Sequence, residues 1–207
     1  MCTIVRGFLA LLAPLRCAAC DEPVDEPVAF CGACSASAQR ATLPGAVFEY
    51  GGPVADAIQR FKYGGRSELA AALGLLMTAD AIRWGGQVDA VVPVPLHWRR
   101  RRTRGYDQAA LLAKPVAKAL AVPPLLRALR RVRNTPSQVD LPFRERQRNM
   151  RRAFAPSRIR GARRVLLIDD VRTTGATIRA ASEALKAGGA VEVHSLVLAA
   201  RVLTEAT

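Results

Sequence analysis

Two adjacent carboxylates followed by a threonine-rich turn are the residues of this chain best suited to chemistry. Asp169 and Asp170 come directly after the apolar run of residues 165–168, and the turn behind them contains threonines and a glycine. Carboxylates accept hydroxyl hydrogens and repel phosphate, whereas a turn that opens a helix offers unpaired N–H groups to a phosphate. A sugar with neighbouring hydroxyls and a terminal phosphate fits both halves. A ribose 5-phosphate is such a ligand.

The predicted ribose-phosphate site is one continuous segment of the chain. In an open parallel sheet, ligands bind beyond the carboxyl ends of the strands, which is where the two aspartates are expected. The threonines would add hydroxyl donors, and the glycine would let the backbone approach the phosphate closely. The alternative is an ordinary polar strand, turn and helix cap without a ligand. The predicted site residues are Asp169, Asp170, Val171, Arg172, Thr173, Thr174, Gly175, Ala176 and Thr177.

Four of the five cysteines form two Cys-x-x-Cys pairs, with ten residues between the pairs. Two such turns aim four thiolates at one point, which suits a tetrahedral zinc ion. Four thiolates leave no open coordination position, so this Zn²⁺ would be structural. Two disulfides are the alternative and would require an oxidising compartment. The predicted zinc ligands are Cys17, Cys20, Cys31 and Cys34.

The net charge of +14 is concentrated in the middle of the chain. Residues 97–152 contain sixteen Lys and Arg side chains against three acidic ones, whereas residues 1–50 contain three against five. Such a concentration indicates a polyanionic partner, either a phosphorylated small molecule or nucleic acid. The same segment has few aromatic residues to stack on the bases of a single strand. Charge alone therefore does not choose between the two partners.

Strands that alternate with helices are predicted to position these groups. Residues 46–50 and 90–92 are predicted strands, and 54–61 and 107–120 are predicted helices. A strand over 165–168, a helix over 176–187 and a strand over 191–199 complete the pattern. Residues 121–163 are rich in Arg and Pro, which is typical of a long loop carrying a hairpin. The alternation predicts an α/β fold, a mostly parallel sheet with helices on both faces.

The chain is predicted to divide near residue 43. Residues 1–42 would form a small module with an N-terminal helix and the four cysteines, and residues 43–207 the α/β domain. The apolar run of residues 8–15 is too short for a convincing signal peptide, and no apolar run approaches the ~20 residues of a membrane span. We therefore expect no membrane span and a cytoplasmic location.

The whole chain resembles the ComF family, phosphoribosyltransferase-like proteins linked to competence and DNA uptake in bacteria. Residues 165–177 match the thirteen-residue signature of the type I phosphoribosyltransferases. The paired Cys-x-x-Cys turns, "FKYGG", "VVPVPLHWRRRRTRGYDQA", "NTPSQ" and "RERQRNMRRAF" are similar to that family's motifs, in the family's order. Asp107 departs from the pattern, because the family usually has Asn there, and the four arginines at 99–102 are denser than is typical. The resemblance implies the type I phosphoribosyltransferase fold with an N-terminal zinc module.

The resemblance also implies where a diphosphate would bind. Backbone amides of the loop after the first core strand would act together with arginines, whose guanidinium groups suit phosphate oxygens. The alternative for the arginine run is a solvated or nucleic-acid-facing start of a helix. The predicted diphosphate residues are Lys62, Val94, Pro95, Leu96, Arg99 and Arg104, with Tyr63 beside Lys62. A flexible loop containing Thr135, Gln138, Arg144 and Arg148 would close over the site.

The activity implied by the resemblance is phosphoribosyl transfer to an unknown acceptor. Phosphoribosyl pyrophosphate would bind with Mg²⁺, and Asp169 and Asp170, the candidate catalytic residues, would stabilise positive charge on the sugar. The two histidines, His97 and His194, are not expected to be catalytic. A competence-helicase-type protein is a further implied partner. The alternative function is a non-catalytic sensor, or a protein that binds single-stranded DNA through its basic face.

Overall fold

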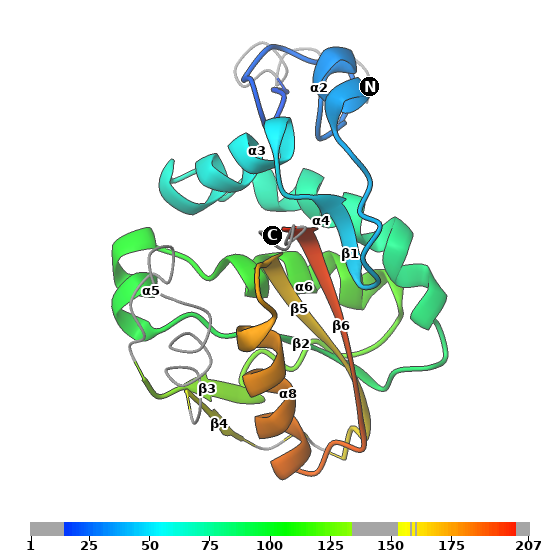
Figure 1. Cartoon of the computed structure of the whole chain (residues 1–207), viewed down its shortest axis with the longest axis vertical. Coiled ribbons are helices and arrows are strands. Elements are labelled where there is room, and N and C mark those ends of the chain that lie inside the picture. The colour runs from blue at the N-terminus through cyan, green and yellow to red at the C-terminus, as the bar shows by residue number, and fades with distance from the viewer. Residues whose placement is uncertain (1–14, 134–152, 158, 160, 202–207) are drawn as a thin grey trace, which may run out of the picture.

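The computed structural model describes residues 15–133, 153–157, 159 and 161–201 (Figure 1). Its main sheet has four parallel strands in the order β1-β6-β5-β2. The sheet and the helices around it confirm the predicted fold class. The four strands are β1 (Ala46–Glu49), β2 (Ala90–Pro93), β5 (Arg164–Arg172) and β6 (Glu192–Ala200).

The helices connect these strands, as the alternating pattern predicted. They are α2 (Gly32–Ser37), α3 (Gly52–Tyr63), α4 (Leu69–Ala81) with the 3₁₀ turn η1 (Ile82–Trp84), α5 (Trp98–Arg104), α6 (Gln108–Ala119) and α8 (Ala176–Ala187). The segment predicted to carry a hairpin contains β3 (Leu129–Arg131) and β4 (Phe154–Pro156), which pair antiparallel. In the part of the chain that the structure describes, no helix has the length and apolar character to cross a bilayer.

Successive residues of β5 point to opposite faces of the sheet, and both faces are buried. Leu166 and Ile168 pack into one hydrophobic cluster with residues of α3, α4 and α6. Val165 and Leu167 pack into a second cluster with residues of α8 and of the β3–β4 pair. Figure 1 shows α8 in front of the sheet and α4 and α6 behind it. The continuous apolar run of this strand is explained by burial on both sides.

Helices α4 and α6 approach each other closely behind the sheet. Pro115 lies inside α6, and its ring contacts Gly74 of α4. A Cβ atom on Gly74 would lie 2.4 Å from Cγ of Pro115, so a larger residue would push the two helices apart. The contact fixes the position of α6, whose first turn borders the candidate site.

Strand β5 is longer than the sequence predicted. Its pairing with β2 ends at Ile168, opposite Pro93, but its pairing with β6 continues to Arg172, opposite Ala200. Asp169 and Asp170 therefore belong to the strand and do not follow it. The extension depends on β6, a non-local partner, and it leaves this end of β5 uncovered on the β2 side.

The four-cysteine segment packs directly onto the α/β domain. Cys17 and Phe30 belong to the same hydrophobic cluster as the helices behind the sheet. The ring of Phe30 meets that of Phe48 of β1 edge-on, with 6.2 Å between the ring centroids. The predicted N-terminal helix lies outside the described residues, apart from Leu15. The module and the domain thus share one core.

Candidate functional site

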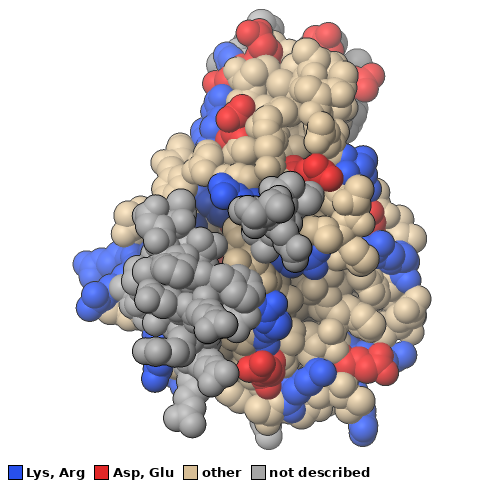
Figure 2. Space-filling model, viewed as in Figure 1, with Lys and Arg blue, Asp and Glu red and all other residues tan. Residues whose placement is uncertain are grey.

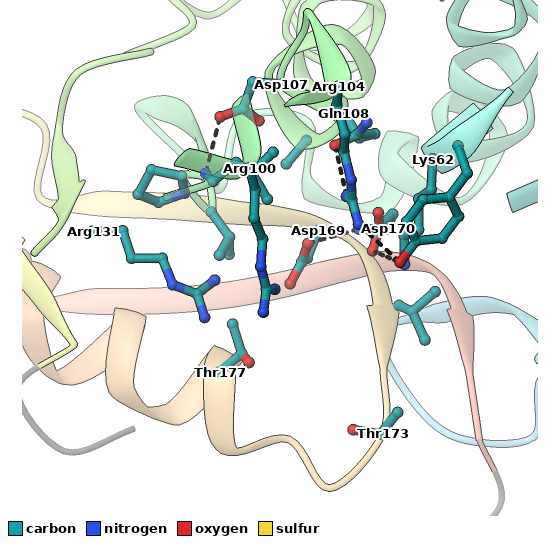
Figure 3. Close-up of a pocket in the computed structure, with 16 residues that line it drawn as sticks. Lys62, Arg100, Arg104, Asp107, Gln108, Arg131, Asp169, Asp170, Thr173 and Thr177 are labelled. Atoms are coloured by element: carbon teal, nitrogen blue, oxygen red, sulfur yellow. Dashed lines mark hydrogen bonds and ion pairs between the residues drawn. The ribbon is translucent and has the colours of Figure 1, made fainter. Parts of the chain in front are cut away.

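A cavity of about 210 Å³ lies at the end of β5 that β2 leaves uncovered (Figure 3). It contains residues from both halves of the predicted site. From the predicted ribose-phosphate segment it brings together Asp169, Asp170, Val171, Thr173 and Thr177, and from the predicted diphosphate set Lys62, Val94, Pro95, Leu96 and Arg104, with Tyr63. The cavity is also lined by Arg100, which belongs to the arginine run expected at the diphosphate but was not singled out, and by residues that were not predicted: Asp107, Gln108, Ala109 and Arg131.

The two aspartates have different surroundings in this cavity. Asp170 is buried, and its Oδ1 lies 3.0 Å from Nζ of Lys62. Asp169 Oδ1 accepts a hydrogen bond of 2.9 Å from the backbone N–H of Asp170. Burial, and then the charge of Asp170, raise the pKa of Asp169 to about 8, although that N–H, Lys62 and Arg131 act against the rise. Without a ligand, the pair therefore holds a proton at neutral pH.

Some residues of the turn after the aspartates line the cavity, and others make contacts within the fold. Thr173 and Thr177 line the cavity, whereas Thr174 Oγ1 accepts a hydrogen bond of 3.4 Å from the Ala176 N–H. Gly175 has φ 74°, and a Cβ atom there would lie 3.1 Å from Nη1 of Arg179, so the position requires glycine. Ala176 begins α8 behind the turn. Among the predicted phosphate ligands, Thr173 and Thr177 are thus those with side chains at the cavity.

Arg172 points away from the cavity. Its Nη2 donates a hydrogen bond of 2.9 Å to the carbonyl oxygen of Pro44, which precedes β1. This contact ties the end of β5 to the start of the first strand. Arg172 therefore connects two strands and does not line the cavity.

Arginines from two separate elements form a basic wall opposite Asp169. Arg100 and Arg104 lie one turn apart on α5, and Arg131 comes from β3. Figure 3 shows Arg100 and Arg131 extending toward Asp169 and Thr177. Burial lowers the pKa of both Arg100 and Arg131, and the charge of another arginine adds to the effect. The cavity thus concentrates positive charge where an anion would gain most from it.

Arg104 is held in place by two side chains. Its Nη2 donates to Tyr63 Oη at 3.0 Å, and its Nη1 donates to Gln108 Oε1 at 3.2 Å. Arg99 does not line this cavity: its guanidinium lies 5.3 Å from the ring centroid of Trp98. Arg100 lines the cavity together with Arg104, because it lies four positions before Arg104 and therefore on the same face of α5.

The backbone amides of the predicted diphosphate loop are already used. The Val94 N–H donates to Ile168 O at 2.8 Å, and the Leu96 N–H donates to Asp107 Oδ2 at 2.9 Å. Pro95 between them has no N–H. The binding of a diphosphate by these loop amides stays a prediction, and it would require both N–H groups to leave their present acceptors. The cations of the wall remain as its anion-binding groups.

Asp107 joins this loop to helix α6. Its Oδ1 accepts a hydrogen bond of 3.2 Å from the Ala110 N–H and so caps the helix, while its Oδ2 accepts the Leu96 N–H. Burial raises the pKa of Asp107, against the effect of these two hydrogen bonds. A carboxylate, with two acceptor oxygens, satisfies both donors at once.

Neither histidine lines the cavity at Asp169. His97 is buried, and its Nδ1 accepts a hydrogen bond of 3.4 Å from the Arg99 N–H at the start of α5. Burial, then the charges of nearby arginines, lower the pKa of His97. His194 lies in β6, with its Nε2 3.6 Å from Glu192 Oε2. The structure gives both residues local contacts within the fold.

The four predicted metal ligands converge. The Sγ atoms of Cys17, Cys20, Cys31 and Cys34 all lie within 4.8 Å of one another, and none of these four described cysteines forms a disulfide. Burial would raise the pKa of Cys17, but backbone N–H groups of Cys20, Cys31 and Ala19 lower it to about 6. Four sulfur donors at one point, one of them stabilised as a thiolate, fit a metal ion with all positions filled by protein.

The predicted flexible loop lies outside the described residues. It comprises Thr135, Gln138, Arg144 and Arg148. The candidate site is therefore built from α3, α5, α6, the loop after β2, β3, β5 and the first turn of α8.

Three comparisons with known proteins bear on this site. Residues 107–205 match the family model of the phosphoribosyl transferase domain. The chain is 31% identical to DNA utilization protein YhgH of Salmonella typhimurium, over 94% of each chain. It is 31% identical to Competence protein F of Haemophilus influenzae, over 93% of each chain.

Solved structures also resemble the chain. One is a glutamine phosphoribosylpyrophosphate amidotransferase from B. subtilis, with 23% identity and a TM-score of 0.47. The similarity covers 67% of this chain and 30% of the amidotransferase chain.

Proposed function

Because the chain belongs to the ComF family, together with DNA utilization protein YhgH and Competence protein F, we propose that its cavity binds phosphoribosyl pyrophosphate or a related ribose phosphate. One observation carries the proposal: two carboxylates, two threonines and a basic wall meet around one cavity (Figure 3). The carboxylates suit the hydroxyls of a ribose, and the threonines and cations suit its phosphates. A ligand with only one of these groups would leave part of the cavity unmatched.

Each part of the ligand is assigned to residues of the cavity. Asp169 and Asp170 accept hydrogen bonds from the ribose hydroxyls. The turn of residues 171–177 binds the 5-phosphate, with Thr173 and Thr177 as side-chain donors. The diphosphate lies against the cations of the wall, which are Lys62, Arg100, Arg104 and Arg131.

Asp169 and Asp170 also fit a magnesium ion, because Mg²⁺ prefers carboxylate oxygens together with phosphates of the substrate. When bound, the ion would offset the negative charge of the diphosphate leaving group. Asp169 must release its proton to serve in this way, and Lys62 must give up its contact with Asp170 to a phosphate. We therefore propose that ligand binding exchanges the internal ion pair for contacts with the ligand.

The proposed reaction is phosphoribosyl transfer to an acceptor. The bond between C1 of the ribose and the diphosphate oxygen breaks, and a bond between C1 and the acceptor forms. Positive charge grows on the sugar in between, and the Asp169 and Asp170 carboxylates stabilise it. The arginine wall stabilises the departing diphosphate.

The four-cysteine cluster is proposed to hold a structural zinc ion. Four converging sulfur atoms without a disulfide support this choice, because zinc takes four thiolates in closed tetrahedral sites. Reduced thiols are typical of proteins in the cytoplasm, which supports that location for this chain. The names of the relatives support a role in DNA utilization or uptake. A competence-helicase-type partner is proposed from the resemblance to the ComF family alone.

Isothermal titration calorimetry with phosphoribosyl pyrophosphate and Mg²⁺ tests the proposal. The wild type should bind, and Asp169→Asn and Asp170→Asn should each weaken binding at least about tenfold, since each removes a hydrogen bond to a charged group. Asp56→Asn, an exposed carboxylate on α3, is the matched control and should bind as the wild type does. Equal affinity in all four proteins would contradict the site.

Release of diphosphate separates the enzyme from a non-catalytic sensor. A transferase should release diphosphate when a competent acceptor is supplied, and Asp169→Asn should abolish the release. A protein that binds the ligand with the same residues, yet releases no diphosphate with nucleobases, nucleosides or nucleic acid, would be the sensor.

A further inference from the structure

A second, larger cavity adjoins the candidate site. Its volume is about 570 Å³, and it shares Pro95, Leu96, Asp107 and Arg131 with the cavity at Asp169. Beyond this shared wall it extends over residues of α5 and β3 and over the segment before β3. We call it the Trp98 groove. A molecule bound in the groove would therefore lie next to the ligand of the first cavity.

The Trp98 groove combines exposed apolar surface with positive charge. Trp98 is 59% exposed, and Leu126 and Val132 are also exposed. Arg101, Arg127 and Arg130 are exposed cations of the same groove. Figure 2 shows Lys and Arg side chains gathered at the left edge of the molecule, over α5.

Among the described residues that line the groove, Asp107 is the one acid, and its two oxygens already accept two backbone N–H groups. The groove therefore presents little negative charge to a ligand. An anion that reaches it meets arginines from two directions.

We propose that the Trp98 groove binds single-stranded nucleic acid. A base stacks against the indole of Trp98, the neighbouring apolar side chains cover its edge, and the phosphates of the strand lie against Arg101, Arg127 and Arg130. Aromatic rings flanked by cations are how proteins hold single strands without reading their sequence. A duplex hides the faces of its bases, so it would use the cations and leave Trp98 in water.

The inference deepens the proposed function and rests on it in one respect. The relatives are named for DNA utilization and competence, and the groove supplies a surface for DNA beside the proposed ribose-phosphate cavity. Binding of the strand itself needs none of the groups that hold a ribose phosphate. The two proposals can therefore fail separately.

Fluorescence anisotropy of the full-length protein with a labelled oligothymidylate of about 12 nucleotides tests the groove. Trp98→Ala should weaken binding between about 5-fold and about 150-fold, because one stacked base is lost, while Trp98→Phe should stay close to wild type. Arg127→Gln combined with Arg130→Gln should reduce the slope of log affinity against log salt by roughly 0.7 for each phosphate contact removed.

Arg83→Gln is the matched control. Arg83 is an exposed arginine whose guanidinium lies 4.2 Å from the ring centroid of another tryptophan, Trp84, and it does not line the groove. It should leave both the affinity and the salt slope unchanged. If Trp98→Ala does not fold, as its thermal melting would show, the double arginine variant and Trp98→Phe still test the groove.

Four results would overturn the proposal. Two concern the variants: an unchanged affinity for the oligothymidylate in Trp98→Ala, or an equal loss of affinity in Arg83→Gln and in the double arginine variant. Two concern the ligand: binding of a duplex of the same length as tightly as the single strand, or full displacement of the strand by polyglutamate at equal charge. Asp169→Asn should leave the affinity for the strand unchanged, and Trp98→Ala should leave calorimetry with phosphoribosyl pyrophosphate unchanged. These two controls therefore distinguish failure of the groove proposal from failure of the ribose-phosphate proposal.

Discussion

Asp169 and Asp170 are neighbours in β5, but they carry their charge in different ways. Asp170 is balanced by Lys62 at 3.0 Å, whereas the raised pKa of Asp169 keeps that carboxyl protonated near neutral pH. Two ionised carboxylates in one buried place would repel each other. The site thus rests in a state with little net negative charge, which a polyanionic ligand can approach.

This arrangement makes the stability of the protein depend on pH. Folded Asp169 keeps its proton up to about pH 8, while the unfolded chain releases it near pH 3.8. Between these values the folded state binds more protons, so the contribution of Asp169 to the free energy of unfolding falls as pH rises. Asp169→Asn cannot ionise, and we expect it to exceed the wild type in stability at pH 8 by at least about 1.4 kcal/mol.

Urea unfolding without ligand, at about pH 5 and about pH 8, measures this difference. Asp56→Asn, whose carboxyl is exposed, should follow the wild type at both values. If the gap between Asp169→Asn and the wild type does not widen with pH, the Asp169 carboxyl is not protonated in the folded protein.

Thr177 gives a second prediction at the level of single residues. Thr177→Val keeps the shape of the side chain but removes its hydroxyl from the cavity, so affinity for phosphoribosyl pyrophosphate should fall by about 2- to 12-fold, the value of one hydrogen bond. Calorimetry measures the change. Thr78→Val, on α4 with its hydroxyl donated to Leu75 O, is the control, and an equal loss there would contradict a direct role for Thr177.

The sequence predicted the residues that lie together in one segment, and it missed those whose side-chain direction depends on the fold. Asp169, Thr173 and Thr177 follow one another along the chain and all line the cavity. Arg100 belongs to the arginine run of residues 99–102 that was expected at the diphosphate, and its four-residue spacing to Arg104 could have singled it out. Arg131 carried no such signal, because it reaches the site only through the pairing of β3 with β4.

At the level of elements, the site exists because β5 extends beyond the end of its neighbour β2. The end of β2 at Pro93 frees the following loop to cross the end of β5, and Asp107 holds that loop against α6. The parallel sheet was predictable from the alternation of strands and helices. The overhang of β5 was not, because pairing with β6 creates it.

Asp107 should therefore matter to both stability and binding. Asp107→Ala removes a helix cap and leaves the Leu96 N–H without its acceptor, so we expect a loss of about 1–3 kcal/mol in the free energy of unfolding. The freed loop should also weaken the affinity of the cavity for phosphoribosyl pyrophosphate. Urea unfolding and calorimetry measure the two effects.

Asp89 offers the matched control for Asp107. Its Oδ2 also accepts two backbone N–H groups, from Arg163 at 3.0 Å and Arg164 at 2.8 Å, but at the opposite end of β5. Asp89→Ala should lower stability and spare ligand affinity. A loss of affinity as large as that of Asp107→Ala would show that destabilisation alone explains the effect.

At the level of the whole molecule, the cysteine module is connected to the cavity through α3. Asp21 lies between Arg60, at 2.8 Å, and Arg66, at 3.1 Å, and Arg60 also donates to Ala19 O at 3.2 Å. These two arginines flank Lys62 and Tyr63, the residues that α3 contributes to the cavity. The cysteine spacing predicted the convergence of the four thiols, but not this contact, which joins side chains far apart in the sequence.

Loss of the proposed zinc ion should consequently lower the stability of the protein and weaken ligand binding in the cavity. Cys17→Ser, or treatment with a zinc chelator, should lower the melting temperature by at least about 2–4 °C, the shift expected for each kcal/mol in a chain of this size. It should also weaken binding of phosphoribosyl pyrophosphate, because α3 loses its support. Differential scanning calorimetry, metal analysis and titration measure the three quantities.

Asp21→Ala separates the contact from the metal. Asp21→Ala should retain zinc but bind phosphoribosyl pyrophosphate more weakly. Asp80→Ala, which breaks the ion pair of 2.6 Å between Arg40 and α4, should retain both the zinc and the ligand affinity. Full ligand affinity in Asp21→Ala would mean that the module and the cavity act independently.

The contact between Lys62 and Asp170 also sets what a small molecule must offer in order to enter. Both side chains are mostly shielded from water, with 18% and 12% exposure, so neither can lose its partner without compensation. Inorganic phosphate would bind the ammonium group of Lys62 and leave the Asp170 carboxylate without a partner. An unphosphorylated diol would bind the carboxylate and leave the ammonium group without a partner. A phosphorylated sugar replaces both partners together, so we expect it to bind more tightly than either inorganic phosphate or an unphosphorylated diol.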